Sequence, residues 1–185
     1  MTGTAMLKRM LSPAQIEVGL LEIADIAKRA NVRVILIGGV ALQAYGGDRF
    51  TVDLDVAAEG RLPELAEESP LSFGGYQSHT PSGVPVDVIL RNDAFARVYR
   101  EALKHPRHFP DLPLGVVSPE FLTLMKMVAR RTKDDSDLET LLGLGIVDEP
   151  KAVRLATRLL GAYAADDLRA LIDVAAWKRS RGNPG

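Results

Sequence analysis

Three aspartates lie within apolar segments of this sequence that have the composition of β-strands. Asp53 and Asp55 alternate with aliphatic residues over 51–57, and Asp87 lies within the apolar run 84–90. Burying carboxylates in such segments costs free energy unless a cation compensates their charge. A divalent metal ion bound together with a nucleoside triphosphate would supply that compensation. The three acids therefore indicate nucleotidyl-transfer chemistry.

The spacing of these acids suits a pair of metal ions. Side chains at i and i+2 of a strand share a face, about 6.5 to 7 Å apart at Cα, so a strand over 51–57 aims Asp53 and Asp55 together. If the 84–90 strand lies beside it, Asp87 joins them. We expect Asp53, Asp55 and Asp87 to hold two Mg²⁺ or Mn²⁺ ions, with Asp87 also taking a proton from an acceptor hydroxyl. The alternatives are a solvated strand edge and a hairpin strand with one exposed face.

A glycine pair and an arginine are suited to binding phosphate near these acids. Gly38 and Gly39 follow the apolar run 32–37, and they would let the backbone approach a triphosphate closely. The N–H groups of the helix that follows would point at the anion. Arg49 precedes the acid pair and could add a charge-assisted contact. Without a ligand, the glycine pair is an ordinary strand-to-helix turn.

The elements that must position these residues form an α/β (α+β) pattern. The periodicity predicts a small mixed sheet flanked by helices in a unit over 1–117, followed by a helical unit over 118–185 with breaks near Lys133, Gly143 to Gly145 and Gly161. Within the first unit we expect helices over 13–30, 40–45, 61–68 and 93–103, strands over 32–37, 51–57 and 114–117, and a hairpin pairing 73–79 with 84–90.

The composition excludes several kinds of site. The chain has 185 residues, a formal net charge of -1 and no cysteine, so disulfides and cysteine-based zinc sites are absent. No apolar run approaches the roughly 20 residues that span a bilayer, so we expect a cytoplasmic protein with no membrane partner. The near-neutral charge does not favour a large nucleic-acid footprint. Neither a Gly-Lys-Ser/Thr phosphate loop nor a G-x-G-x-x-G dinucleotide signature is present.

Taken together, the motifs resemble a known superfamily. Gly38-Gly39, Arg49-Phe50-Thr51, Asp53-x-Asp55 and the later Asp87 resemble the polymerase-β-type nucleotidyltransferases. Among these, the chain is most similar to small bacterial AbiEii-like nucleotidyltransferases of toxin–antitoxin systems, and it also resembles antibiotic nucleotidyltransferases such as those for lincosamides. The stretch 124–138 adds to the likeness, because those relatives carry a lysine on one helix and a Lys-Asp pair at the start of the next.

The resemblance implies further roles. Lys126 would contact the triphosphate, and Asp134 or Asp135 would orient basic groups or contact substrate, with no basis for choosing between them. The residues alone also allow a simpler explanation, in which Lys126, with Arg130, Arg131 and Lys133 near it, compensates the helix dipole.

The implied activity is that of a metal-dependent enzyme. It would move a nucleoside monophosphate from an NTP such as ATP to a hydroxyl of an RNA or tRNA end, a protein or a small molecule. The likeness to toxins adds an antitoxin protein as a partner. The alternative is a catalytically inactive relative that binds nucleotide or protein.

Overall fold

The computed structural model describes residues 9–129 and 132–181, and it contains one mixed β-sheet. The strands are β1 (Val34–Ile37), β2 (Leu54–Ala58), β3 (Ser69–Pro70), β4 (Gly75–His79), β5 (Pro85–Ile89) and β6 (Gly115–Val116). Their order in the sheet is β3-β4-β5-β2-β1-β6. The β2–β5 and β1–β6 pairs are parallel, and the other neighbours are antiparallel.

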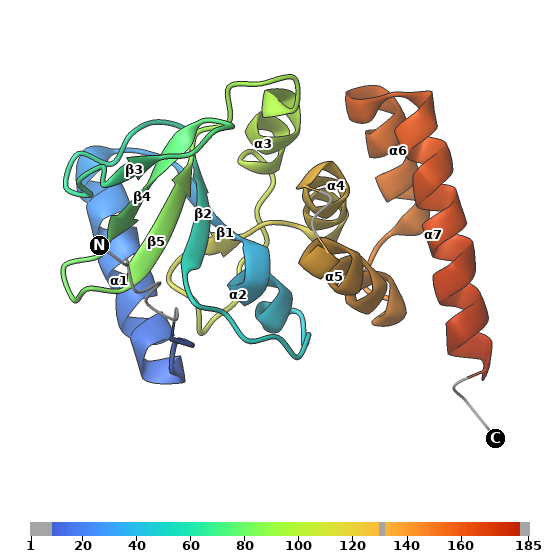
Figure 1. Cartoon of the computed structure of the whole chain (residues 1–185), viewed down its shortest axis with the longest axis horizontal. Helices are drawn as coiled ribbons and strands as arrows, with labels where there is room; N and C mark the ends of the chain where they lie inside the picture. Colours follow the sequence, from blue (N-terminus) through green and yellow to red (C-terminus); the bar gives the residue numbers. More distant parts are fainter. Residues whose placement is uncertain (1–8, 130–131, 182–185) are drawn as a thin grey trace, which may run out of the picture.

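Helices flank this sheet and make up most of the described C-terminal part. They are α1 (Pro13–Ala30), α2 (Gly38–Ala44), α3 (Ala96–Ala102), α4 (Pro119–Ala129), α5 (Thr132–Gly143), α6 (Glu149–Leu160) and α7 (Ala162–Arg181). Figure 1 shows α1 beside the sheet and α4 and α5 between the sheet and the outer pair α6 and α7. The α/β fold with a helical C-terminal part is therefore confirmed.

Helix α1 covers one face of the sheet. Ser12 caps it, because its hydroxyl accepts from the Gln15 N–H while the Gln15 side chain accepts from the Ser12 N–H. A β-carbon at Gly19 would lie only 2.7 Å from a side-chain carbon of Leu54 and 3.1 Å from one of Val84, so the missing side chain lets α1 approach the sheet closely. This face of the sheet is consequently apolar and buried.

The alternation along β2 and β5 places the acids on the opposite face. Leu54 and Val56 in β2, like Val86 and Val88 in β5, are almost completely buried in the core. Successive side chains of a strand point to opposite faces. The acidic residues between these aliphatic ones therefore face away from α1, toward the side where α4 lies.

Two expectations about this half of the chain were wrong. The segment 61–68 is a turn and not a helix. Its conformation is fixed by the buried Tyr76 hydroxyl, which accepts from the Leu62 N–H and donates to the Leu62 carbonyl. The strand expected over 51–57 begins only at Leu54, because β1 ends at Ile37, opposite Asp55, and its ladder reaches no further back.

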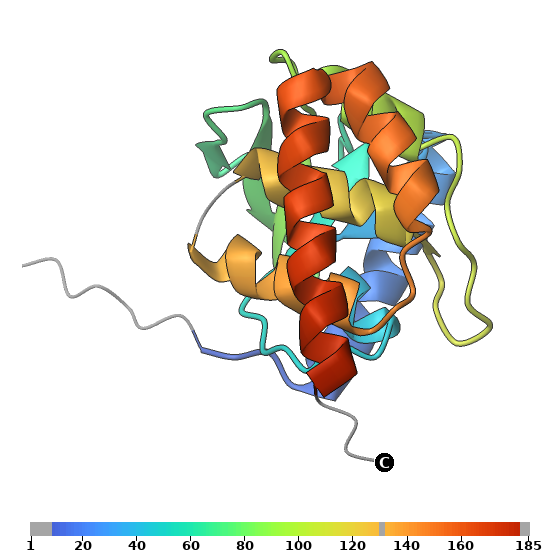
Figure 2. The same ribbon diagram turned by 90° about the vertical axis from the view of Figure 1, so that its right-hand side faces the viewer.

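The helical part is broken where glycines were expected to break it. Gly145 and Gly161 both adopt positive φ beyond helix ends, at 67° and 97°. The break predicted near Lys133 falls between α4 and α5, where Arg130 and Arg131 lie outside the described residues. Figure 2 shows α7 crossing in front of α4 and α5. Among the described residues, no helix has the length and apolar character needed to cross a membrane.

Candidate functional site

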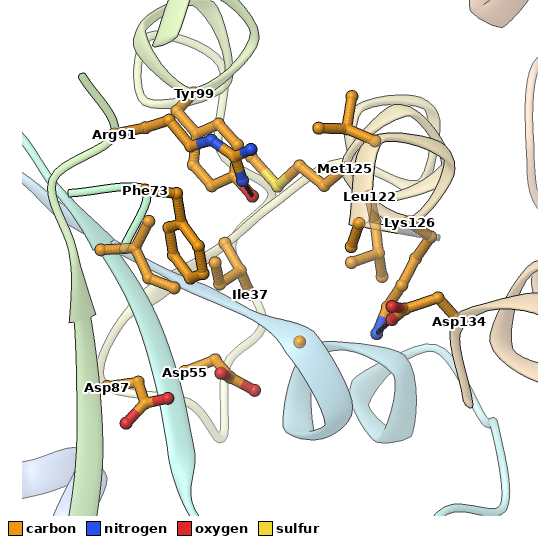
Figure 3. A pocket seen from close by; sticks show the side chains of 14 residues that line it. Ile37, Asp55, Phe73, Asp87, Arg91, Tyr99, Leu122, Met125, Lys126 and Asp134 are labelled. Carbon is orange, nitrogen blue, oxygen red and sulfur yellow. Dashed lines mark hydrogen bonds and ion pairs between the residues drawn. The ribbon is translucent and has the colours of Figure 1, made fainter. Parts of the chain in front are cut away.

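Asp55 and Asp87 form the centre of the candidate site. They are direct register partners in the parallel β2–β5 ladder, so the two carboxylates leave neighbouring strands on the same face of the sheet. Figure 3 shows them next to each other at the floor of a cavity, with Lys126 and Asp134 on its opposite wall. Both aspartates are half-buried. The sheet thus places two carboxylates side by side, and carboxylate oxygens are ligands that Mg²⁺ prefers.

Gly38 lies directly against this pair. Its φ is +68°, and a β-carbon built there would come 2.1 Å from Asp55 Oδ2. Glycine is therefore needed at this position for two reasons: the left-handed backbone and the carboxylate that occupies the space of a side chain. A β-carbon on Gly39 would lie 3.4 Å from Arg49 Nε. The glycine pair accordingly lies between the acids and the predicted arginine.

Asp53 does not join the ladder. It lies in a bend before β2, where the Thr51 hydroxyl donates to the Asp53 carbonyl over 2.7 Å. Asp53 lines a second cavity, which it shares with Asp87 but not with Asp55. Within residues 9–129 and 132–181, the structure gathers no group of three or more acidic or histidine side chains as a ready metal site. The structure therefore pairs Asp55 with Asp87 and places Asp53 upstream of this pair, not in one group with both.

Lys126 belongs to a buried ionic cluster between helices. Its ammonium donates to Asp134 Oδ1 over 3.1 Å and to Asp137 Oδ2 over 2.5 Å, and all three side chains are at most 6% exposed. The other oxygen of Asp137 accepts from Arg49, whose backbone carbonyl accepts from the Gln43 side chain. Asp137 therefore links the two cations that the sequence had assigned to phosphate binding.

Asp137 was not among the site residues predicted from the sequence, so its central position was missed. A signal existed, because Asp134 and Asp137 are spaced i, i+3 and share a helix face, whereas Asp135 does not. The structure leaves Asp135 exposed and places it in a groove beside α7, away from the acid pair. Arg130 and Arg131, predicted to extend the basic cluster, lie outside the described residues.

Aromatic side chains also line the central cavity, and no sequence motif predicted them. The cavity measures about 180 Å³ and includes Phe73, Arg91 and Tyr99 among its lining residues. The Arg91 guanidinium lies 4.8 Å from the centre of the Phe73 ring and 5.3 Å from that of Tyr99. Burial raises the pKa of Tyr99; the nearby Arg91 opposes this shift, and the charge of Asp55 adds to it. These side chains thus offer flat rings and a cation beside the acids.

The donor set fits a hard divalent cation at this site. Asp55 and Asp87 present carboxylate oxygens, which are the ligands that Mg²⁺ and Mn²⁺ prefer, and Mg²⁺ usually binds through one or two carboxylates together with substrate phosphates and waters. Because Gly38 has no side chain, the Asp55 carboxylate can occupy the space next to it. A pair of acids is therefore compatible with metal bound jointly with a triphosphate.

The fold is similar to solved nucleotidyltransferase-like structures. The crystal structure of an antigenic nucleotidyltransferase-like protein from Paracoccidioides brasiliensis superimposes with a TM-score of 0.50 and 15% identity, covering 89% of this chain and 95% of that one. The solution structure of the antibiotic-resistance factor ANT(2'')-Ia gives a TM-score of 0.49 and 16% identity, covering 92% and 99%. No family model and no curated protein matches the sequence. The first likeness shows that the chain has a nucleotidyltransferase-like fold.

Proposed function

We propose that this protein is an enzyme that transfers a nucleoside monophosphate from an NTP to a hydroxyl acceptor. The observation that carries the proposal is the register pairing of Asp55 with Asp87. Gly38 packs against Asp55, and Lys126 lies across the cavity from the two acids. In a nucleotidyltransferase-like fold, adjacent acids and a facing cation are the groups that this reaction needs.

Each group has a proposed task. Gly38 and Gly39 allow close backbone approach to the β- and γ-phosphates, and Arg49 and Lys126 bind phosphate oxygens. A lysine ammonium has three N–H donors, of which Asp134 and Asp137 use two, so one remains for a phosphate. Arg49 gives one of its five donors to Asp137 and keeps the others. Asp137 is therefore a positioning residue that holds both cations.

Asp55 and Asp87 would hold Mg²⁺ or Mn²⁺, with Asp53 as the third acid. When bound, the ions neutralise charge on the triphosphate and acidify the attacking hydroxyl. Asp87 accepts the hydroxyl proton, and pyrophosphate leaves. The Gln77 amide donates to Asp87 Oδ1 over 3.0 Å and so fixes the orientation of this carboxylate.

The toxin role and its antitoxin partner rest on the resemblance of the sequence, and the cytoplasmic location rests on the lack of a long apolar run. A toxin role, an antitoxin partner and a cytoplasmic location remain predictions.

Thermal unfolding measured with each NTP tests the first step of the proposed reaction, the binding of the NTP. A ligand that binds only the folded state adds about 2.7 kcal/mol of stability at a hundredfold excess over its Kd. We expect one NTP to raise the melting temperature only with Mg²⁺ or Mn²⁺, and Asp55→Asn to abolish the rise. The charge-matched control is Asp166→Asn on α7, whose side chain is 70% exposed and should keep the full shift.

The outcomes separate the two main hypotheses. A metal-dependent shift in the wild type and the control, absent in Asp55→Asn, supports the transferase site. An NTP shift that needs no metal and survives in Asp55→Asn would favour the inactive nucleotide-binding module. No shift with any NTP would count against both.

A further inference from the structure

A second cavity opens at the edge of the sheet where β2 and β5 begin and β4 ends. It measures about 390 Å³, and its lining includes Asp53, Glu68, Gln77, His79, Pro85 and Asp87. Asp87 lies in the walls of both cavities, whereas Asp55, Gly38 and Lys126 line only the central one. The two cavities therefore meet at the carboxylate proposed to take the acceptor proton.

The direction of attack assigns a role to this second cavity. In an in-line displacement, the nucleophile approaches phosphorus from the side opposite the leaving group. The proposed phosphate ligands, Lys126 and Gly38, line the central cavity. In Figure 3, Asp55 lies between Lys126 and Asp87, so Asp87 is the acid farther from Lys126. Pyrophosphate would thus leave toward the central cavity, so the hydroxyl must enter from the side of Asp87 that faces the second cavity.

The polar lining of the second cavity is preorganised around Asp87. The Ser69 hydroxyl donates to Gln77 Oε1 over 3.1 Å, which orients the amide so that Nε2 donates to Asp87. At the rim, His79 Nδ1 lies 2.7 Å from Glu68 Oε1. Apolar side chains such as Met10 and Val52 complete the wall. This mixture of a few fixed polar groups and an apolar surface is typical of small-molecule sites, whose volumes run from about 300 to 1,000 Å³.

The charges disfavour a nucleic-acid acceptor. Proteins bind nucleic acid chiefly through lysine and arginine side chains that contact its phosphates. Among the described residues, the lining has one arginine, Arg9, and its carboxylates include Asp53, Glu68 and Asp87. If Asp53 and Asp87 bind metal, the carboxylate of Glu68 still offsets the positive charge of Arg9 and His79, so the part of the lining that the structure describes forms no basic patch.

The basic residues near the C-terminus do not supply such a patch either. Lys178 pairs with Glu139, and Arg179 pairs with Glu149. Arg181 stacks on Trp177, 4.5 Å from the ring centre.

We infer that the second cavity is the acceptor subsite and that the acceptor is a small-molecule alcohol. This inference rests on the proposed nucleotidyl transfer. The alcohol oxygen forms a bond to the α-phosphorus, and the bond from that phosphorus to the bridging oxygen breaks. Pyrophosphate leaves with the electron pair, and the hydroxyl proton passes to Asp87.

A pair of tryptophan substitutions tests the assignment. Pro85 lies two residues before Asp87 on the same strand face, so Pro85→Trp fills the second cavity. Val128→Trp fills the central cavity from α4. The substrates are α-labelled NTP with Mg²⁺ and three separate acceptor pools: small metabolites from a bacterial extract, bulk tRNA and protein. Melting temperatures with NTP report donor binding in each variant.

We expect the wild type to label the small-metabolite pool. Pro85→Trp should lose about a hundredfold in this transfer while keeping the NTP-induced stability shift, because only acceptor placement changes. Val128→Trp should lose the shift itself. If Pro85→Trp does not fold, His79→Trp replaces it, since this side chain is 47% exposed.

The outcomes distinguish the two levels of inference. Three outcomes overturn the acceptor assignment alone, provided that NTP binding is intact. They are label on tRNA or protein, label on none of the pools, and undiminished transfer by the variant that fills the second cavity. Loss of any NTP shift in the wild type overturns the proposed function beneath it.

Discussion

The two sides of the candidate site are held in place by different forces. On the sheet, the backbone ladder between β2 and β5 places Asp55 and Asp87, which adjoin each other because their strands pair in that register. Across the cavity, side chains hold one another: Lys126 is positioned by Asp134 and Asp137 in a buried ionic cluster. One side depends on main-chain hydrogen bonds, and the other depends on charge pairing.

This difference separates activity from stability. Neutralising an acid on the sheet leaves the ladder intact, and like charges in register are themselves mildly destabilising. Removing one acid from the helical cluster instead leaves a buried cation with fewer partners, which is costly. Substitutions on the sheet should therefore act mainly on turnover, and substitutions in the cluster should act mainly on folding.

Asp55→Asn should give the largest effect. We expect turnover of NTP to fall by about 10³-fold, equivalent to about 4 kcal/mol in the activation barrier, because a group that stabilises transition-state charge is lost. The free energy of unfolding in urea should change by less than about 1 kcal/mol. A large loss of stability would show that the acid pair is held by more than its ladder.

Asp137→Ala should give the reverse pattern. It removes the carboxylate that accepts from both Lys126 and Arg49, so we expect a loss of about 3 kcal/mol in the free energy of unfolding. Asp135→Ala, an exposed acid on the same helix, should stay within about 0.5 kcal/mol. Equal urea midpoints for the two variants would contradict the charge-pairing account of this side.

Gly38→Ala tests the contact between glycine and acid. The positive φ costs about 1 to 2 kcal/mol for any other residue, and the new β-carbon would displace Asp55 as well. Gly46→Ala is the matched control, because Gly46 has φ +90° but open space around it. Both variants should lose stability, measured by urea unfolding. Only Gly38→Ala should also lose metal-dependent NTP binding; the same loss in Gly46→Ala would rule out the steric explanation.

The smallest effect concerns pH on the helical side. Burial alone would raise the pKa of Glu120, but the Ser118 hydroxyl, the Lys151 ammonium and nearby N–H groups outweigh it and lower this pKa below 4.5. A carboxyl whose pKa is lower in the folded state contributes stability above its unfolded pKa and loses it as pH falls through the folded pKa.

Unfolding free energies measured from pH 6 down through the range below about 4.5 should therefore fall less steeply for Glu120→Gln than for the wild type. Parallel curves for the two proteins would show that Glu120 does not contribute to this pH dependence of stability.

Local patterns predicted those features that depend on neighbouring residues. The helix over 13–30, the hairpin of β4 and β5, and the helix-ending glycines depend on residues a few positions apart. Alternation in β5 placed Asp87 opposite its aliphatic neighbours for the same reason, since the side-chain period of a strand is two. The helix expected over 61–68 failed because a distant side chain, Tyr76, fixes the backbone at Leu62.

The sequence by itself thus determined that Asp55 and Asp87 point away from their core-facing aliphatic neighbours, and that a short helix follows the first apolar strand. Only the tertiary structure decided that β2 and β5 are parallel neighbours, that Asp53 falls outside their ladder, and that Asp137 joins Arg49 to Lys126 over 88 residues of chain. Periodicity encodes the direction in which a side chain points, but its partner depends on which distant segments pair, and that pairing is set by the packing of the whole core.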